Sequence, residues 1–146
     1  MARNKDIEVD KFSRELEEIF AEVVDAGNYG ALEGVRTGIR VGAREWRKDA
    51  KDSIGEHTYR RHGKTYTSGM YARSIRSHML STDETKPAGE VGSRKLYGLT
   101  HLLENGHARV GGGRVKPVLH LAEDVAPAAF DAAIQAAGEA FDGWMQ

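Results

Sequence analysis

Residues 97–122 read YGLTHLLENGHARVGGGRVKPVLHLA, and this stretch decides how the second half of the chain is organised. Its beginning predicts a short amphipathic helix over 96–105, because leucines recur on one face at the helical period. Gly106 ends this helix as a left-handed cap. Residues 109–116 form a hairpin whose tip is the flexible run 111–113, three glycines. The stretch frames no group of nucleophile, base and orienting residue, so an assembly component is favoured over an enzyme.

Short strands and a long final helix surround this stretch. Ser68 begins a short helical turn that reaches Arg73. Alternating apolar residues and turn residues predict antiparallel strands at 74–80, 88–93, 108–110 and 115–119. The last helix runs over 121–144, and Pro127 is tolerated only near its start or at a kink.

Two helices precede the strands. The first covers 9–26, where apolar residues follow the helical period, and Gly27 with Asn28 supplies its stop. The second covers 29–54 and carries a glycine at every fourth position in its first half. Each interior glycine costs up to about 1 kcal/mol relative to alanine, so close approach by another helix must compensate. That partner is either the first helix of the same chain or another subunit. The candidate oligomer contacts are Gly30, Gly34, Gly38 and Gly42.

The predicted fold class is α+β, in one domain that spans residues 1–146. Two N-terminal helices precede a small, mainly antiparallel sheet, a short helix and a long C-terminal helix, in the order α-α-β-β-α-β-α. The chain is 40% hydrophobic, which is enough for a single modest core.

Composition argues against several classes of protein. The chain has no cysteine, so it holds neither a disulfide framework nor a zinc-thiolate site. Residues 1–10 are charged where a secretory signal would be apolar, and no run approaches the roughly 18 apolar residues of a membrane span. We expect a soluble protein that is made in the cytoplasm and has no membrane partner.

Charged residues are segregated along the chain, although the formal net charge is only -1. Residues 1–33 hold nine acidic and four basic side chains, whereas residues 36–64 hold nine basic and four acidic ones. Residues 121–146 hold five acidic side chains and no lysine or arginine. Such segregation lets identical subunits meet through unlike faces, although most such charges in proteins simply face solvent.

The segment 55–68 has no periodicity and is basic, aromatic and interrupted by glycine. We expect a flexible loop there, which faces either a neighbouring protein or DNA. Its side chains are of the types that bind phosphates and stack on bases, so a nucleic-acid-binding module over 36–64 is an alternative function. The loop residues in question are Tyr59, Arg60, Arg61, Lys64 and Tyr66.

A metal-dependent enzyme is the least favoured alternative. His101, Glu104 and His107 are spaced three apart, and the first two share a helix face as metal ligands often do. Gly106 ends the helix before His107, however, and the zincin order His-Glu-x-x-His is absent. The other histidines, His120 among them, add no recognisable spacing. We therefore predict no catalytic residue, metal or cofactor.

Three short motifs, in this order, resemble elements of the tailed-bacteriophage neck and tail-completion proteins. Residues 67–75, TSGMYARSI, are similar to that family's TG-x-L-x-x-S-I element. Residues 97–107 resemble its Y-x-x-x-x-E-x-G-T helix and stop, with His107 in place of threonine, and residues 117–122, PVLHLA, resemble its P-x-L-x-x-A lead into a final helix. The motif positions are Ser68, Gly69, Ser74, Ile75, Tyr97, Glu104, Gly106, Pro117, Leu119 and Ala122.

The resemblance implies a structural protein of the virion. In that family, the subunits form a homo-oligomeric ring, a hexamer or dodecamer, which joins the capsid connector or head-closure protein to a tail terminator or tail tube. Double-stranded DNA passes through such a ring. The resemblance also implies that Glu104, Gly106 and Pro117 shape the fold, with Glu104 fixing nearby backbone amides or an arginine. The basic loop and the glycine tip would then reorder when one ring docks to the next.

Overall fold

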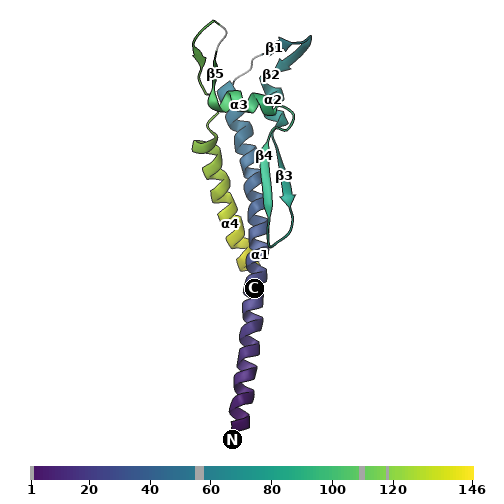
Figure 1. Ribbon diagram of the computed structural model, residues 1–146, viewed down its shortest axis with the longest axis vertical. Coiled ribbons are helices and arrows are strands. Elements are labelled where there is room, and N and C mark those ends of the chain that lie inside the picture. The colour runs from purple at the N-terminus through teal and green to yellow at the C-terminus, as the bar shows by residue number, and fades with distance from the viewer. Residues whose placement is uncertain (1, 55–57, 109–110, 118) are drawn as a thin grey trace.

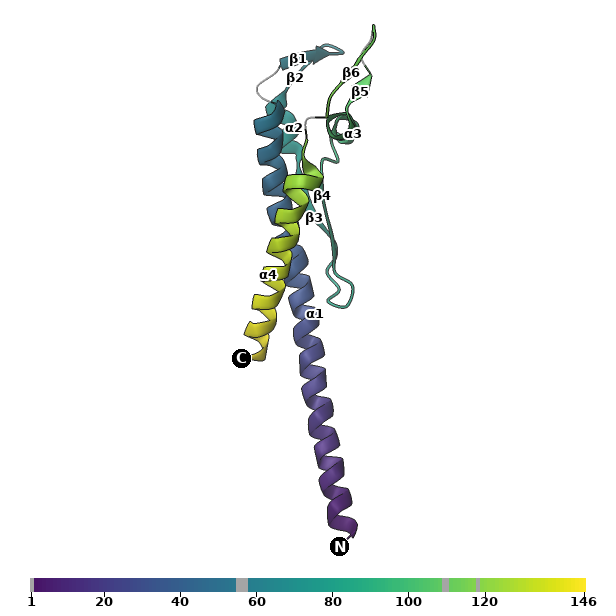
Figure 2. The ribbon, with the colours of Figure 1, turned by 90° about the vertical axis from the view of Figure 1, so that its left-hand side faces the viewer.

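The computed structural model describes residues 2–54, 58–108, 111–117 and 119–146, and its fold is α+β, as the sequence predicts. The α-helices are α1 (Ala2–Ile54), α2 (Ser68–Ser74), α3 (Tyr97–Asn105) and α4 (Ala126–Met145). Helix α1 is the axis of an elongated molecule, and α4 runs antiparallel along one side of it (Figure 1). Turning the molecule shows a long hairpin on another side of α1, while α2 and α3 lie near its C-terminal end (Figure 2).

The N-terminal half of the chain is one helix, so the predicted break at Gly27 and Asn28 is wrong. Tertiary packing explains the difference. Ala26, directly before the predicted stop, is fully buried, and the ring of Tyr29 directly after it lies 5.2 Å from that of Trp144 in α4. Gly27 and Asn28 together cost roughly 1.5 kcal/mol of helix propensity, which burial on both sides of them offsets.

The glycine stripe of α1 packs against α4 of the same chain. A Cβ atom built on Gly34 would lie 2.8 Å from the backbone oxygen of Ala133, and one on Gly38 would lie 2.8 Å from the Ala133 Cβ. Gly30 is equally close to α4, with 2.7 Å from its Cβ position to the Ala137 backbone oxygen, whereas a Cβ on Gly42 would make an ordinary contact of 3.4 Å with Ala129. The stripe is therefore an intrachain contact in this structure, and its partner is α4 rather than residues 9–26. Alanines repeat every fourth position on α4, at 129, 133 and 137, so that two rows of small residues bring the backbones together.

Three separate two-stranded antiparallel hairpins replace the single small sheet that we expected. They pair β1 (Thr58–Arg61) with β2 (Lys64–Thr67), β3 (Arg76–Ser81) with β4 (Ala88–Gly92), and β5 (His107–Ala108) with β6 (Arg114–Val115). The β3–β4 pair confirms the predicted strands at 74–80 and 88–93 to within a few residues. It packs on α1, since a Cβ built on Gly89 would lie 2.9 Å from the side chain of Ile39.

A π-helical turn, Leu121–Val125, leads into α4. We predicted one continuous α-helix over 121–144, so the structure differs in the first five residues. Pro127 lies in the first turn of α4, directly after the π-helical turn, as expected from its position near the start of the last helix. Within the described ranges, no helix is both long and apolar enough to cross a membrane.

Candidate functional site

The N-terminal part of α1 projects beyond the rest of the molecule as an isolated helix (Figures 1 and 2). We call residues 11–25 the arm, and every side chain in it is exposed. Six large apolar side chains form a stripe along the arm, with exposed fractions between 38% and 64%. They are Phe12, Leu16, Ile19, Phe20, Val23 and Val24. Because a contiguous apolar surface of this kind marks an interaction site, the arm is the candidate functional site.

Acidic side chains border the apolar stripe of the arm. At 3.6 residues per turn, Glu15 and Glu22 follow one edge of the stripe and Glu17 follows the other. Only Glu15 among these has a described ion pair, with Lys11 at 3.9 Å, and both side chains of that pair are exposed. Such exposed pairs contribute less than about 1 kcal/mol, so the stripe keeps acidic borders.

A smaller apolar surface lies on the outer face of α4. Phe130 and Ile134 stand one helical turn apart and are 68% and 72% exposed. The charged residues of α4 are all acidic, Asp131 among them. This surface therefore has the same combination of apolar and acidic groups as the arm.

The predicted basic loop at 55–68 is in large part an ordered hairpin, so the expectation of an irregular loop is wrong for 58–67. Its two-residue turn is His62 and Gly63, with φ angles of 51° and 74°. Two positive φ angles give the turn the twist that a tight hairpin requires. The His62-Gly63 pair was therefore a sequence signal for a tight hairpin turn, but the many charged residues around it favoured the prediction of an irregular loop. Residues 55–57 lie outside the described residues.

The hairpin register places the candidate phosphate-binding residues on two faces. Tyr59 pairs with Tyr66 and Arg61 with Lys64, so these four positions share one face, while Arg60 belongs to the other. Lys64 is exposed; the side chains of the other four lie outside the described residues. Hence the hairpin gathers two aromatic and two basic positions, which remains compatible with contact to either a protein or DNA.

The basic residues of α1 are partly engaged within the chain. Arg47 donates a hydrogen bond from Nη1 to the Ile75 backbone oxygen at 3.0 Å, which fixes the end of α2 on α1. Arg36 pairs with Glu33 at 3.1 Å, and Arg44 lies 3.5 Å from Glu45. The Arg47 contact serves the fold, whereas the side chains of Arg36 and Arg44 stay largely exposed in their ion pairs, so these contacts do not decide between a protein and a nucleic-acid partner for 36–64.

The first family-like motif supplies the centre of the core. Tyr71 is 1% exposed and Ile75 is fully buried. The Trp46 indole donates to the Tyr71 hydroxyl at 3.1 Å, and that hydroxyl also bonds Thr100 at 3.0 Å. Burial raises the pKa of Tyr71, although both hydrogen bonds act in the opposite direction. The motif therefore ties α2, α1 and α3 together.

Ser74 connects the first motif to the segment before α3. Its hydroxyl donates to the Tyr71 backbone oxygen at 2.6 Å and lies 2.6 Å from the hydroxyl of the buried Ser93. Ser93 in turn accepts the Leu96 backbone N–H at 3.0 Å. Gly69 is half-buried within α2, while the side chain of Ser68 lies outside the described residues.

The second motif ends α3 as predicted, with one difference in geometry. Gly106 follows Asn105 directly and is buried, and its φ of 73° is positive as expected. Its ψ of 179° is extended rather than left-handed helical, a combination that essentially only glycine adopts. Tyr97 is 65% exposed. Glu104 is exposed and makes no hydrogen bond or ion pair with the described residues, so its predicted role in fixing amides or an arginine is not seen.

The third motif joins α3 to the start of the last helix. Leu119 is 6% exposed and its backbone N–H bonds the Leu103 oxygen at 3.2 Å, whereas Pro117 is exposed. The side chain of Ala122 lies outside the described residues, and so does residue 118. The tip glycines at 111–113 all have positive φ angles, which the predicted tip requires.

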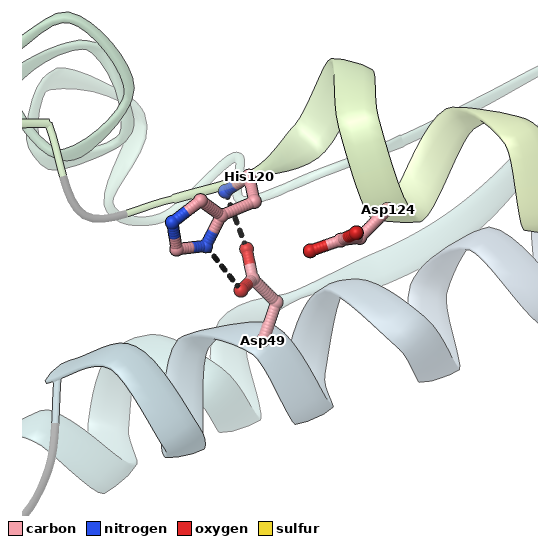
Figure 3. A group of neighbouring side chains, drawn as sticks. All are labelled: Asp49, His120 and Asp124. Carbon is pink, nitrogen blue, oxygen red and sulfur yellow. Dashed lines mark hydrogen bonds and ion pairs between the residues drawn. The ribbon is translucent and has the colours of Figure 1, made fainter.

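The helix end separates the histidines of the metal hypothesis. His101 and Glu104 lie in α3, whereas His107 begins β5 beyond the end of the helix. The side chains of both histidines lie outside the described residues. The structure instead gathers Asp49, His120 and Asp124, whose ligand-type atoms lie within 4.8 Å of one another (Figure 3). Sequence reasoning missed this group because Asp49 lies 71 residues before His120 along the chain, and the spacing of His120 and Asp124 alone does not indicate a site.

Asp49 holds the start of the last helix against α1. Its Oδ2 accepts the His120 backbone N–H at 2.7 Å, and its Oδ1 accepts the Ser53 hydroxyl at 3.0 Å and lies 3.0 Å from His120 Nδ1 (Figure 3). Its side chain is 10% exposed, whereas those of His120 and Asp124 face solvent. Because both Asp49 oxygens are already bonded, the group acts as a clamp between α1 and the π-helical turn.

The clamp shifts both of its ionisable groups toward their charged forms. For Asp49, burial raises the pKa, but the hydrogen bonds from His120 and Ser53 outweigh it and the net shift is downward from the ordinary 3.8. For His120, the hydrogen bond to Asp49 and its negative charge raise the pKa above the ordinary 6.5. The clamp is therefore an ion pair at mildly acidic pH.

No family model, curated protein or solved structure matches this chain. The resemblance to the neck and tail-completion proteins thus remains a hypothesis that rests on the three short motifs.

Proposed function

We propose that this protein is a structural subunit of a tailed-bacteriophage virion, which assembles as a homo-oligomeric ring at the head-tail junction and leaves a passage for the genome. The observation that most directly supports an assembly role is the exposed apolar stripe of the arm. It presents six large apolar side chains that nothing in the described chain covers. A lone helix in water is marginally stable, so a helix with this surface gains most from burial against another protein.

The three family-like motifs support the choice of this assembly over others. Three residues of these segments, Tyr71, Ile75 and Leu119, are buried in the core where α1, α2 and α3 meet, whereas the motif positions 97, 104 and 117 are exposed. The segregated charges add support, because a ring needs two different complementary surfaces on each subunit.

The proposed mechanism is geometric. Heterologous contacts between identical subunits close into a ring when the rotation between neighbours divides a full turn. The faces of the ring then dock to the connector or head-closure protein on one side and to the tail terminator or tail tube on the other. The β1–β2 and β5–β6 hairpins lie together at one end of the molecule, where they would meet such a neighbouring ring (Figure 1).

Electron microscopy tests this proposal in two stages. Negative-stain images of the isolated full-length protein should show closed rings, and labelling of native phage particles should place the protein at the neck. A persistent monomer that is also absent from the particle would refute the proposal. Rings that bind no particle would limit it to self-assembly.

A further inference from the structure

A basic groove opens on the side of the molecule that carries α2 and the β3–β4 hairpin. Its volume is about 730 Å³. Apolar side chains from Met70 and Leu96 line it together with four cationic ones. The cationic residues are Arg73, Arg76, Arg94 and Lys95.

Most of this positive charge is uncompensated within the chain. Arg94 pairs with Glu90 through its guanidinium. No carboxylate among the described residues pairs with Arg73, Arg76 or Lys95, and all three side chains are exposed. The groove therefore suits an occupant that is both apolar and acidic.

The arm has this chemistry, since glutamates border its apolar stripe on both sides. We propose that the arm of one copy of this chain lies in the basic groove of the next copy. The stripe covers the apolar lining of Met70 and Leu96, and the bordering Glu15, Glu17 and Glu22 face the groove's arginines and lysine. This inference rests on the proposed self-assembly and names the two surfaces that meet.

Charge decides against the other apolar surfaces as partners of the arm. Two arms packed together through their stripes would bring acidic borders side by side in either orientation, because both edges of the stripe carry glutamate. The outer face of α4, with Phe130 and Ile134, is acidic as well. Like charges at an interface cost binding energy, whereas the groove offers opposite ones.

The positions of the arm and the groove mean that the two surfaces meet only between different copies of the chain. Arg47 of α1 bonds the Ile75 oxygen beside the groove, and the middle of the arm lies near Glu18. At a rise of 1.5 Å per residue, about 44 Å of helix separates the two levels. A straight α1 keeps the arm of each copy away from its own groove (Figure 1). In a ring, each copy offers its arm to one neighbour and its groove to another.

Charge reversal tests this contact in the full-length protein. Glu15→Lys with Glu22→Lys should weaken self-association by roughly 100-fold, and so should Arg73→Glu with Arg76→Glu, because like charges then meet. A chain that carries all four substitutions should self-associate again, as its reversed surfaces complement each other. The matched controls are Asp25→Lys, on the far side of the arm, and Lys86→Glu, in the exposed β3–β4 turn, and both should assemble normally. Circular dichroism checks that every variant folds.

Cross-linking locates the contact directly, because the chain has no cysteine of its own. A copy with Glu15→Cys and a copy with Lys95→Cys, mixed with a short bis-maleimide, should give mainly the mixed dimer. Mainly Glu15→Cys homodimers would overturn the inference in favour of an arm-arm contact. Failure of the four-fold variant to recover, with rings still present, would overturn it while leaving the proposed function intact. Absence of rings in the unmodified protein would contradict both. Groove variants that lose binding to duplex DNA but assemble normally would assign the groove to nucleic acid instead.

Discussion

Residues 26–54 of α1 carry glycine where they meet α4, whereas residues 11–25 carry phenylalanine, leucine and isoleucine where no described residue covers them. Both parts belong to one unbroken helix with an apolar face. In the covered part, the small residues let the backbones of α1 and α4 approach closely, and a larger side chain at these glycines would clash with α4. In the arm, the large apolar side chains are exposed, and only a partner with a complementary surface would bury them. The difference teaches that apolar periodicity alone does not distinguish a face buried within the chain from one buried between chains.

The largest difference should appear between two isoleucines, one from each situation. Ile75 is fully buried and Ile19 is 53% exposed. Ile75→Ala should lower the free energy of unfolding by about 2–5 kcal/mol, because it leaves a cavity in the core. Ile19→Ala should change it by less than about 0.5 kcal/mol when measured under conditions where the protein is monomeric. Urea denaturation followed by circular dichroism measures both, and equal losses would contradict the assignment of the arm as uncovered.

Two glycine substitutions compare a position of α1 that contacts α4 with one that does not. A Cβ on Gly34 would lie within 3.0 Å of α4, whereas one on Gly27 would meet nothing within 4 Å. Gly34→Ala should therefore destabilise the protein by about 1–3 kcal/mol through overpacking. Gly27→Ala should stabilise it by about 0.5–1 kcal/mol through its higher helix propensity. Thermal denaturation of the two variants gives the signs, and stabilisation by Gly34→Ala would show that α4 does not lie on this stripe.

The smallest effect concerns the pH dependence of the clamp at Asp49 and His120. The raised pKa of His120 means that its contribution is complete below the ordinary 6.5 and is lost as pH rises through the higher folded value. The lowered pKa of Asp49 means that its contribution is lost only as pH falls below the ordinary 3.8. The stability difference between the native protein and His120→Ala should thus be greatest between these values and should shrink above pH 6.5.

Asp49→Asn supplies the control for this measurement. In that background the His120 side chain loses the carboxylate that raises its pKa most and keeps only the weaker influence of Asp124 and Glu123, so His120→Ala should change the pH dependence of unfolding much less. A pH-dependent difference of undiminished size in Asp49→Asn would contradict the assignment of Asp49 as the main partner of His120.

Local patterns predicted much of this fold, because they depend on neighbours in sequence. Helix α3 and the stop at Gly106, the β3–β4 hairpin and the position of Pro127 all follow from period, turn residues and proline geometry. The unbroken α1 did not, since burial of Ala26 and the contact of Tyr29 with Trp144 override two weak helix formers. Those contacts join residues more than a hundred positions apart.

The candidate site shows the same limit. The apolar stripe of the arm was visible in the sequence, where Phe12 to Val24 follow the helical period, but it indicated burial within the chain. The pairing of Gly34 and Gly38 with the alanines of α4, and of Asp49 with His120, required the antiparallel approach of two distant segments. Matching the glycine repeat of α1 to the alanine repeat of α4 was the one signal that would have found this helix pair from sequence.

The mass of the assembled protein tests the central claim, that the arm is an assembly surface, most directly. Size-exclusion chromatography with light scattering should give a multi-subunit mass for the unmodified chain. Replacing Leu16, Ile19 and Phe20 by serine should give the mass of a monomer, while the stability of residues 26–146 should stay unchanged. Glu18→Ser lies off the stripe and should leave the assembly intact. An identical multi-subunit mass for the unmodified chain and the serine variant would contradict the account.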